Sequence, residues 1–225
     1  MGAASPDLLR TIPLLESLGD DDLNALAALL REKAYPRGSI VVSQGDLGDA
    51  LFVIASGQLK VAVFAEDGRE VILSVLATGG FFGEMSLLDD EPRSAHVIAM
   101  TDAALWQLRR DDFRVRLRAS PALAEGLLKE LSRRLRRADE TIAGMALLDV
   151  NGRIASLLLE MAREEGGDRI TRRLTHANIG QMVGASRETV SRTMRSLAIR
   201  GVIAVSRREI VLRDPSALRL AAHRA

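Results

Sequence analysis

The spacing of hydrophobic residues changes twice along the chain and divides it into a helical start, a β-rich middle and a helical second half. In residues 7–34 leucines and isoleucines recur at steps of three and four, which predicts helix, and Pro36 ends the pattern. From Ser39 short β-branched runs broken by glycines predict strands, at 40–42, 51–54, 59–63, 71–76 and 96–100. Short, closely spaced strands are typical of a small antiparallel barrel or roll.

A long helix is predicted from Pro121 through Leu147. Its apolar residues alternate steps of three and four, as a coiled-coil seam does, at Leu128, Leu131, Leu135, Ala138, Ile142 and Met145. The same spacing fits an amphipathic helix packed on its own roll, so pairing between chains and packing within one chain both stay open. Asp149 is a suitable cap for a further helix over 151–161, which makes 148–150 a hinge.

The last part of the chain predicts a helix-turn-helix. After a loop at two glycines and a short strand expected at 170–174, a helix opens after Thr175 and ends at Gly184. Ser186 can cap a second helix. Its buried side carries Val190, Met194 and Leu197. Residues 201–213 are then expected to form a β-hairpin wing.

Charge is distributed unevenly about Val150. From Asn151 onward the chain has 14 arginines, no lysine and 7 acidic residues, a net +7, so the preceding part carries −6 of the overall +1. A basic domain suits a polyanionic partner such as nucleic acid, although a solvated arginine-rich surface has the same composition.

The segment that begins at Phe81 has the composition of an anion-binding cradle. Gly83 lets the backbone approach a ligand, and the helical turn after it can direct amide groups at an anion. Arg93 supplies a guanidinium fork that suits a phosphate, and Glu84 can accept from a ribose hydroxyl. These residues predict a site for a nucleoside cyclic phosphate. The alternative is a surface loop in which the arginine pairs with a neighbouring aspartate or glutamate.

The second helix of the helix-turn-helix carries polar residues on its outward face near the N-terminus, where such helices meet base edges. Arginine can donate twice to guanine, and glutamate can accept from cytosine N4. The residues concerned are Arg187, Glu188, Ser191 and Arg192. At the turn of the hairpin, Arg207 and Arg208 are available for DNA phosphates. The alternative is a set of solvated helix residues.

Two stretches identify a family. Phe-Gly-Glu-Met-Ser-Leu-Leu followed by Pro-Arg-Ser-Ala resembles the phosphate-binding cassette of cyclic-nucleotide-binding domains, and Ser-Arg-Glu-Thr-Val-x-Arg resembles the recognition helix of the cyclic-AMP receptor protein (CRP)/FNR family. The chain is identified as a member of that family of bacterial transcription regulators. The resemblance implies an α+β fold: a cyclic-nucleotide-binding β-roll at 1–120, a dimerisation helix and hinge at 121–149, and a winged helix-turn-helix DNA-binding domain at 150–225.

The resemblance also implies site residues and partners. The ligand-binding set is Gly83, Glu84, Met85, Ser86, Arg93, Ser94, Arg134, Ala138 and Asp139. Within it Ser94 is a phosphate donor and Arg134 orients Glu84. The DNA-binding set is Thr175, Ser186, Arg187, Glu188, Thr189, Ser191, Arg192, Arg207 and Arg208. The expected partners are double-stranded DNA with a palindrome of TGTGA-type half-sites, a second copy of the chain, and RNA polymerase.

One position departs from the family's pattern. In members that respond to cyclic AMP, two consecutive polar residues of the dimer helix contact the adenine, and here they are Ala138 and Asp139. Alanine offers no hydrogen bond, which removes a contact worth about 0.5–1.5 kcal/mol. Asp139 can accept from the adenine amino group or from two donors of guanine. Cyclic AMP is therefore the first expectation, with cyclic GMP, cyclic di-GMP or a ligand-independent regulator as alternatives.

Composition narrows the remaining classes. The absence of cysteine excludes disulfides and thiolate iron–sulfur clusters, and no apolar run approaches the ~18 residues of a membrane span. A cytoplasmic protein with no membrane partner is expected. His96, His176 and His223 lack the spacing of a phosphodiesterase metal cluster, and His96 is better explained as a core residue than as a haem ligand. No enzyme activity, metal or haem is expected.

Arg187→Ala is expected to weaken binding to the specific operator, because a base-reading arginine contributes about 1–3 kcal/mol at one base pair. Electrophoretic mobility shifts against operator and unrelated DNA, at one stated salt concentration, measure the effect. A uniform loss over all sequences contradicts the base-reading role.

Overall fold

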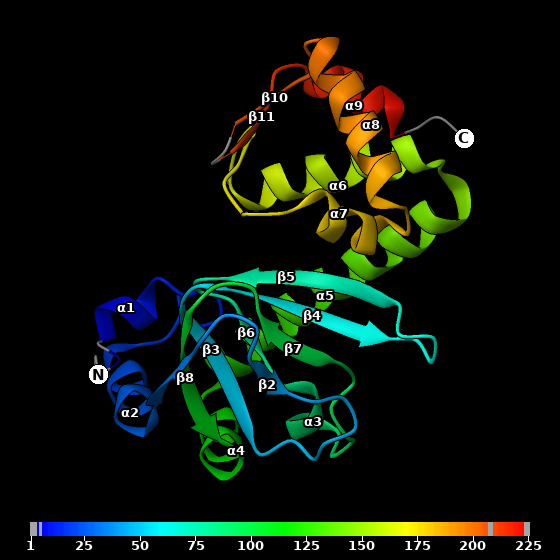
Figure 1. The fold of residues 1–225 in the computed structure, drawn as a ribbon. Coiled ribbons are helices and arrows are strands. Elements are labelled where there is room, and N and C mark those ends of the chain that lie inside the picture. Colours follow the sequence, from blue (N-terminus) through cyan, green and yellow to red (C-terminus); the bar gives the residue numbers. More distant parts are fainter. Residues whose placement is uncertain (1–3, 5, 207–208, 223–225) are drawn as a thin grey trace. The chain divides into compact units, whose positions relative to one another are not determined.

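The structure is a computed structural model that describes residues 4, 6–206 and 209–222. The chain forms two compact units, Met1–Arg134 and Leu135–Ala225, so that helix α5 (Pro121–Leu147) begins in the first and ends in the second. Each unit has hydrophobic clusters of its own. The first unit is a roll of β-strands with helices, and the second is mainly helical (Figure 1).

The roll consists of two four-stranded sheets in which all pairs are antiparallel. One has the order β1-β8-β3-β6, with the bounds Arg31–Tyr35, Ala103–Arg109, Ala50–Ser56 and Phe81–Phe82. The other has the order β2-β7-β4-β5, with the bounds Ile40–Val42, His96–Ala99, Gln58–Phe64 and Glu70–Ala77. Buried side chains of both sheets form one core, in which the rings of Phe52 and Phe82 stack 4.9 Å apart. The predicted antiparallel roll is confirmed.

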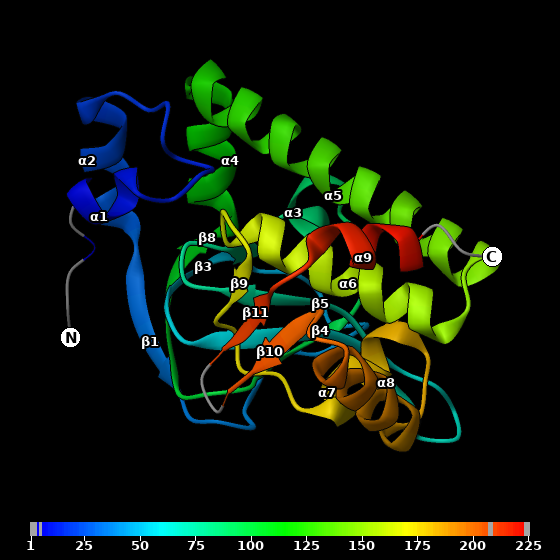
Figure 2. The same cartoon turned by 90° about the horizontal axis from the view of Figure 1, so that it is seen from above.

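Helices cover one side of the roll (Figure 2). They are α1 (Pro6–Arg10), α2 (Asp20–Leu29), the short α3 (Met85–Leu88), α4 (Arg110–Ala119) and the start of α5. Leu9, Leu23, Phe113 and Leu127 are almost fully buried and join α1, α2, α4 and α5 to the roll in one cluster. α4 packs against β3 and β8, which places it beside the loop that carries α3.

The start of the chain differs from the prediction of helix over 7–34. α1 ends at Arg10, and the chain then turns past Pro13, whose ring is incompatible with a helix interior. Residues 31–35 form β1, because pairing with β8 satisfies their backbone groups along the sheet edge. The predicted strands at 40–42, 51–54, 59–63, 71–76 and 96–100 correspond to β2, β3, β4, β5 and β7. The spacing missed β1, β6, β8 and α4.

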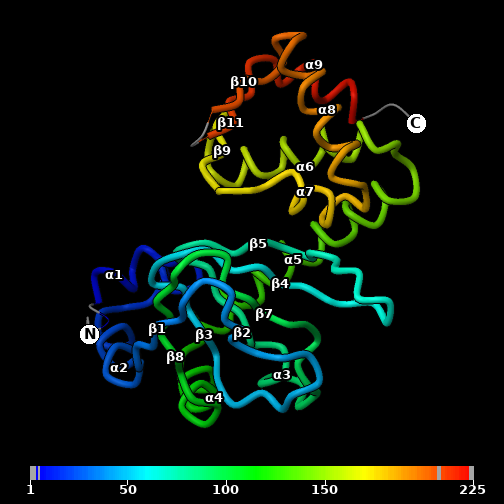
Figure 3. The backbone as a smooth tube through the Cα atoms, viewed as in Figure 1, coloured from blue at the N-terminus to red at the C-terminus, as the bar shows by residue number. Residues whose placement is uncertain are grey.

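The second unit contains the predicted helix-turn-helix. After the end of α5 come α6 (Val150–Glu164), α7 (His176–Val183), α8 (Arg187–Ile199) and α9 (Pro215–Ala221). β9 (Arg169–Ile170), β11 (Ile210–Leu212) and β10 (Ile203–Val205) form a small antiparallel sheet, which Figure 3 shows beside α6. Ile154, Leu158 and Val190 are buried in the hydrophobic core of the second unit. The strand expected at 170–174 ends at Ile170, since only Arg169 and Ile170 pair with β11.

Side-chain caps fix the helix starts in the second unit. Asp149 Oδ1 accepts from the Gly152 N–H at 2.7 Å, as predicted for the cap of α6. Thr175 and Asn178 form a reciprocal capping box at α7. Gly184, at φ +65°, ends α7 in the left-handed conformation. These local bonds explain why the sequence signals placed α6, α7 and α8 well, whereas α9 was missed.

Gly126→Ala is expected to destabilise the first unit, although removing a helical glycine gains about 0.5–1 kcal/mol. A Cβ at Gly126 lies 2.7 Å from the Leu14 carbonyl oxygen, a backbone atom held in a buried segment. The packed backbone has to shift to make room for this Cβ, which should lower the free energy of unfolding by about 1–3 kcal/mol. Gly144→Ala is the control, because its Cβ only meets Leu148 Cδ1 at 3.7 Å. Urea unfolding distinguishes them; a stabilised Gly126→Ala protein refutes the close approach.

Candidate functional site

Arg93 is buried at the cassette and bonds to protein acceptors. Its Nη1 donates to Gly83 O at 2.7 Å and to Ser86 Oγ at 2.9 Å, and its Nη2 donates to Ala50 O at 2.8 Å. Only 6% of the residue is exposed. A surface loop with Arg93 paired to a carboxylate of that loop is therefore the wrong alternative.

The electrostatics of this arginine reflect its burial. Desolvation lowers the pKa of the Arg93 guanidinium, and the carboxylates of Asp49 and Glu84 partly oppose that change. Because arginine stays protonated at neutral pH in proteins, a positive charge is held away from bulk water. Such a charge favours an anionic ligand.

Glu84 is buried beside this cation and lacks one partner. Its Oε1 accepts from Arg134 Nη1 at 3.0 Å, and Arg134 Nη2 also donates to Phe81 O at 2.7 Å. Glu84 Oε2 has no hydrogen-bond partner within the described residues, although the residue is 2% exposed. An orphaned buried acceptor costs free energy until a donor reaches it. A ligand hydroxyl is such a donor.

Two glycines let the backbone approach the guanidinium closely. A Cβ at Gly83, which has φ +91°, would lie 2.6 Å from Arg93 Nη1 and 2.9 Å from Ala50 O. A Cβ at Gly48 would lie 2.1 Å from Ser86 Oγ. Sequence reasoning named Gly83 but missed Gly48 and Ala50. Only the glycine punctuation before β3 signalled this contribution, and it was interpreted as a turn.

The other predicted ligand residues are less enclosed. Within the cassette, Met85 and Ser94 are exposed. Ala138 and Asp139 follow Arg134 on α5, in the second unit, and both are exposed. The structure therefore brings together Gly83, Glu84, Ser86, Arg93 and Arg134.

The predicted DNA-binding face lies along α8 of the second unit. Arg187, Glu188 and Arg192 are exposed, and Ser191 is half-buried. Val190, Thr193, Met194 and Leu197 face the core, as the spacing predicted for three of them. A backbone hydrogen bond of Glu188 itself, followed by one from Ser186, lowers the pKa of the Glu188 carboxyl, which keeps it ionised as an acceptor.

Local bonds position this helix. Ser186 Oγ accepts from the Thr189 N–H at 3.2 Å, and Thr193 Oγ1 donates to Asn151 Oδ1 at 2.8 Å on α6. The Thr193 contact was missed, because the sequence does not show which polar residues of two helices will meet. Thr175 is exposed at the start of α7. Arg207 and Arg208 lie outside the described residues.

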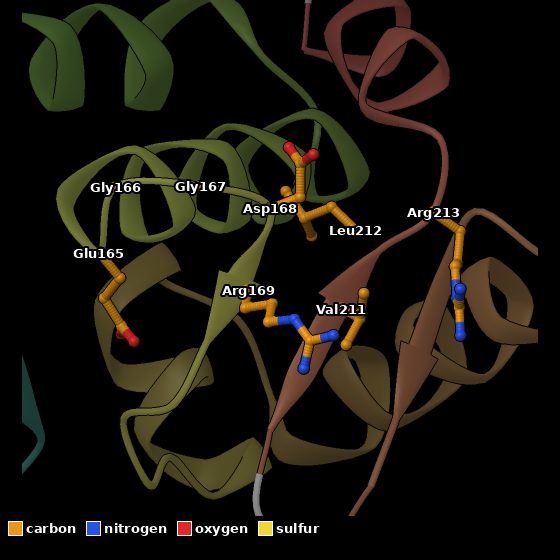
Figure 4. A pocket seen from close by; sticks show the side chains of 8 residues that line it. All are labelled: Glu165, Gly166, Gly167, Asp168, Arg169, Val211, Leu212 and Arg213. Carbon is orange, nitrogen blue, oxygen red and sulfur yellow. The ribbon is translucent and has the colours of Figure 1, made fainter.

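A cavity of 580 Å³ belongs to the second unit and contains none of the predicted site residues. Its lining, shown in Figure 4, is Glu165, Gly166, Gly167, Asp168, Arg169, Val211, Leu212 and Arg213. Arg169 lies 3.2 Å from Glu209 Oε2, and Glu165 Oε2 accepts from the Thr171 N–H at 2.6 Å. Arg169 and Glu165 thus already bond within the protein, and the cavity lies apart from the residues predicted to bind the ligand.

Three further features concern His96, metal-holding groups and membrane spans. His96 Nδ1 accepts from the Gln44 N–H at 3.3 Å, which agrees with a satisfied packing role. Over the described part of the chain, no group of three or more histidine, aspartate or glutamate side chains is arranged to hold a metal ion. Among the helices that the structure describes, none combines the length and the hydropathy that a membrane span requires.

The fold and the two sites define a class: a transcription regulator with a cyclic-nucleotide-binding roll and a DNA-binding helix-turn-helix. Family models support both halves. The model of the cyclic nucleotide-binding domain matches residues 32–120, and that of the Crp-like helix-turn-helix domain matches residues 152–221.

Individual relatives agree over almost the whole chain. The CRP-like cAMP-activated global transcriptional regulator of Mycobacterium tuberculosis is 35% identical over 94% of this chain and 97% of its own. The cyclic AMP receptor protein of Thermus thermophilus is 34% identical over 93% of this chain and 96% of its own. The structure of FixK2 from Bradyrhizobium japonicum, at 22% identity, shares the fold with a TM-score of 0.78 over 87% of this chain and 98% of its own. The chain belongs to the CRP/FNR family of transcription regulators, and at the level of the family these are regulators rather than enzymes.

Glu84→Gln is expected to change stability in a pH-dependent way. Burial raises the pKa of Glu84 above 4.5, although Arg134 opposes the change. Between the unfolded and folded pKa values the folded state binds more protons, so Glu84's contribution to the free energy of unfolding falls as pH rises through that window. In urea unfolding, the free energy of unfolding of Glu84→Gln relative to that of wild type should therefore be higher at about pH 7 than at about pH 4. Glu66→Gln controls for losing an exposed carboxylate; a pH-independent difference contradicts the prediction.

Proposed function

We propose that this protein is a cyclic-nucleotide-responsive, sequence-specific DNA-binding regulator that acts as a homodimer on a TGTGA-like palindrome, with cyclic AMP as its first effector. One observation carries the ligand half: a buried carboxylate oxygen of Glu84 that has no donor in the described part of the chain, close to the buried guanidinium of Arg93. A ribose 2′-hydroxyl supplies the donor, and a cyclic phosphate supplies the anion. The two relatives named for cyclic AMP, from Mycobacterium tuberculosis and Thermus thermophilus, support the same choice.

The identity of the purine rests on Ala138 and Asp139, which occupy the family's base-contacting positions. Both side chains are exposed. Asp139 can accept from the adenine amino group, whereas guanine offers it two donors, N1–H and the amino group. Cyclic GMP and cyclic di-GMP are therefore the competitors that any binding measurement has to include.

The homodimer is proposed from the faces of α5. One face, with Leu123 and Leu127, is buried in the roll. A different face exposes Leu128, Leu135 and Ile142, each about two-thirds exposed and spaced by seven residues. A repeat of seven apolar positions is the pattern by which two helices pair. A second copy of α5 is the proposed occupant, and a twofold pair matches a palindromic operator.

DNA reading is assigned to the exposed N-terminal part of α8. Arg187 and Arg192 can donate to guanine and Glu188 can accept from cytosine, while Thr175, Ser186, Thr189 and Ser191 are proposed to contact the backbone or base edges. The ligand can alter this reading only if it binds two arrangements of the hinge with different affinity. RNA polymerase is the further partner that the family implies.

One observation favours a second candidate, a regulator that needs no ligand. The Nη atoms of Arg93 already donate to Gly83 O, Ser86 Oγ and Ala50 O. In this second candidate, the cassette is closed by its own bonds and holds the roll together without binding a ligand. Operator affinity measured with and without each cyclic nucleotide, at one fixed salt concentration, separates a sensor from this alternative.

Wild-type protein is expected to bind cyclic AMP in calorimetry, and Arg93→Ala should weaken binding about tenfold to a hundredfold, as loss of a charge-assisted bond does. Arg118→Ala, an exposed arginine on α4, is the control. Ligand-free melting temperatures show whether Arg93→Ala still folds. If neither cyclic AMP, cyclic GMP nor cyclic di-GMP binds the wild-type protein, the sensor function is refuted.

A further inference from the structure

Two arginines of α4, neither of which belongs to the predicted ligand-binding set, bond to the end of α3. Arg110 Nη2 donates to Ser86 O at 3.0 Å, and Arg114 Nε donates to Leu87 O at 3.0 Å. These carbonyls belong to the last turn of α3, where a helix has no intrahelical donors left. α4 therefore caps α3 with charged side chains from a different part of the chain.

Asp90 completes this arrangement. Its Oδ1 accepts from Arg114 Nη2 at 2.6 Å and also pairs with Arg110. Hydrogen bonds from Arg114 and then Arg110 lower the pKa of the Asp90 carboxyl. We call Asp90, Arg110 and Arg114 the α4 clamp.

The backbone of Asp90 indicates that the clamp is a specified feature. Asp90 has φ +62°, and among the described residues it is the sole non-glycine with positive φ. This left-handed position follows the C-cap of α3, where glycine is the usual residue. An aspartate there accepts a conformational cost, and its carboxylate offsets that cost by bonding to the two arginines.

The α4 clamp connects directly to the ligand cassette. The carbonyl oxygen of Ser86 accepts a hydrogen bond from Arg110 Nη2. The hydroxyl oxygen of Ser86 accepts one from Arg93 Nη1 at 2.9 Å. Arg110 Nε also donates to Gly48 O at 2.9 Å, and Gly48 lies so close to Arg93 that a Cβ there would be 3.0 Å from Cζ. A movement of Arg110 therefore displaces two groups that border the phosphate-binding guanidinium.

We propose that the α4 clamp positions Ser86 and Arg93 for the cyclic phosphate and so sets the affinity for the ligand without contacting it. This inference rests on the proposed cyclic-nucleotide function. Its members are positioning residues, because their bonds end on the backbone of the cassette and on one another.

Asp90→Asn tests the clamp, because asparagine tolerates the left-handed conformation but carries no charge. The Kd for cyclic AMP, measured by calorimetry on the full chain, should rise about tenfold, as loss of charge-assisted bonds does. The matched control is Asp67→Asn, an exposed aspartate paired with Arg69 at 2.7 Å in the turn between β4 and β5. Its Kd should equal that of wild type, and ligand-free melting curves should show that both variants still fold.

Two further measurements separate positioning from general stability. In ligand-free protein, amides of Leu88 and Asp89, which bond to carbonyls of Glu84 and Met85, should exchange hydrogen faster in Asp90→Asn. In a double-mutant cycle, Arg114→Ala should raise the Kd by a smaller factor in Asp90→Asn than in wild type, because both variants remove the Arg114–Asp90 bond and only the bond of Arg114 to Leu87 O is left to lose. A purely structural role lowers the melting temperature and leaves the Kd unchanged.

The outcomes are distinguishable. If wild type binds cyclic AMP and Asp90→Asn binds it equally well, the clamp proposal is overturned and the sensor function stands. Asp90→Gly, which relieves the backbone cost, should also bind weakly, and wild-type affinity in that variant likewise overturns it. If wild type binds no cyclic nucleotide, the proposed function fails and the positioning role fails with it, and hydrogen exchange then shows only whether the clamp holds α3.

Discussion

The first unit depends on the burial of opposite charges at one point of the roll. Arg93 and Glu84 are removed from water, and neither is neutralised by a simple ion pair with the other. Backbone carbonyls accept from the arginine, while Arg134 occupies one oxygen of the carboxylate. The remaining oxygen of Glu84 has no donor among the described residues, so the burial of this carboxylate is compensated by hydrogen bonds at only one of its two oxygens. This unpartnered oxygen is the observation on which the proposed ligand site rests.

Several distant segments have to converge for this to occur. Gly48 comes from the loop before β3, Ala50 from the first position of β3, Gly83 from the cassette and Arg134 from α5. Arg134 also stacks on Phe81, with its guanidinium 4.2 Å from the ring centroid. The last residue of the first unit thus contacts the cassette, and α5 continues from it into the second unit. One helix is therefore covalently continuous with both the ligand site and the unit that carries α8.

The second unit follows a simpler logic, since its helices are placed by local caps and one apolar core. Asp149, Thr175 and Ser186 each bond to backbone N–H groups of the helix that follows. With these helix starts fixed and Val190 and Met194 buried, the arginines of α8 have only the outer face left. The exposure of the residues proposed to read bases is therefore a consequence of packing on the opposite side of α8.

The sequence by itself determined the antiparallel roll, the long α5, the capped helix-turn-helix and the family, because caps, turn glycines and apolar periodicity act over a few residues. Only the tertiary structure decided that 31–35 form a strand rather than helix, because that depends on pairing with the distant strand β8, in which Tyr35 lies opposite Ala103. It also decided that Arg93 bonds to Ala50, and that two arginines of α4 hold Asp90. Hydrogen bonds between distant segments leave no periodic trace in the sequence, since each residue type fits many partners until the chain has folded.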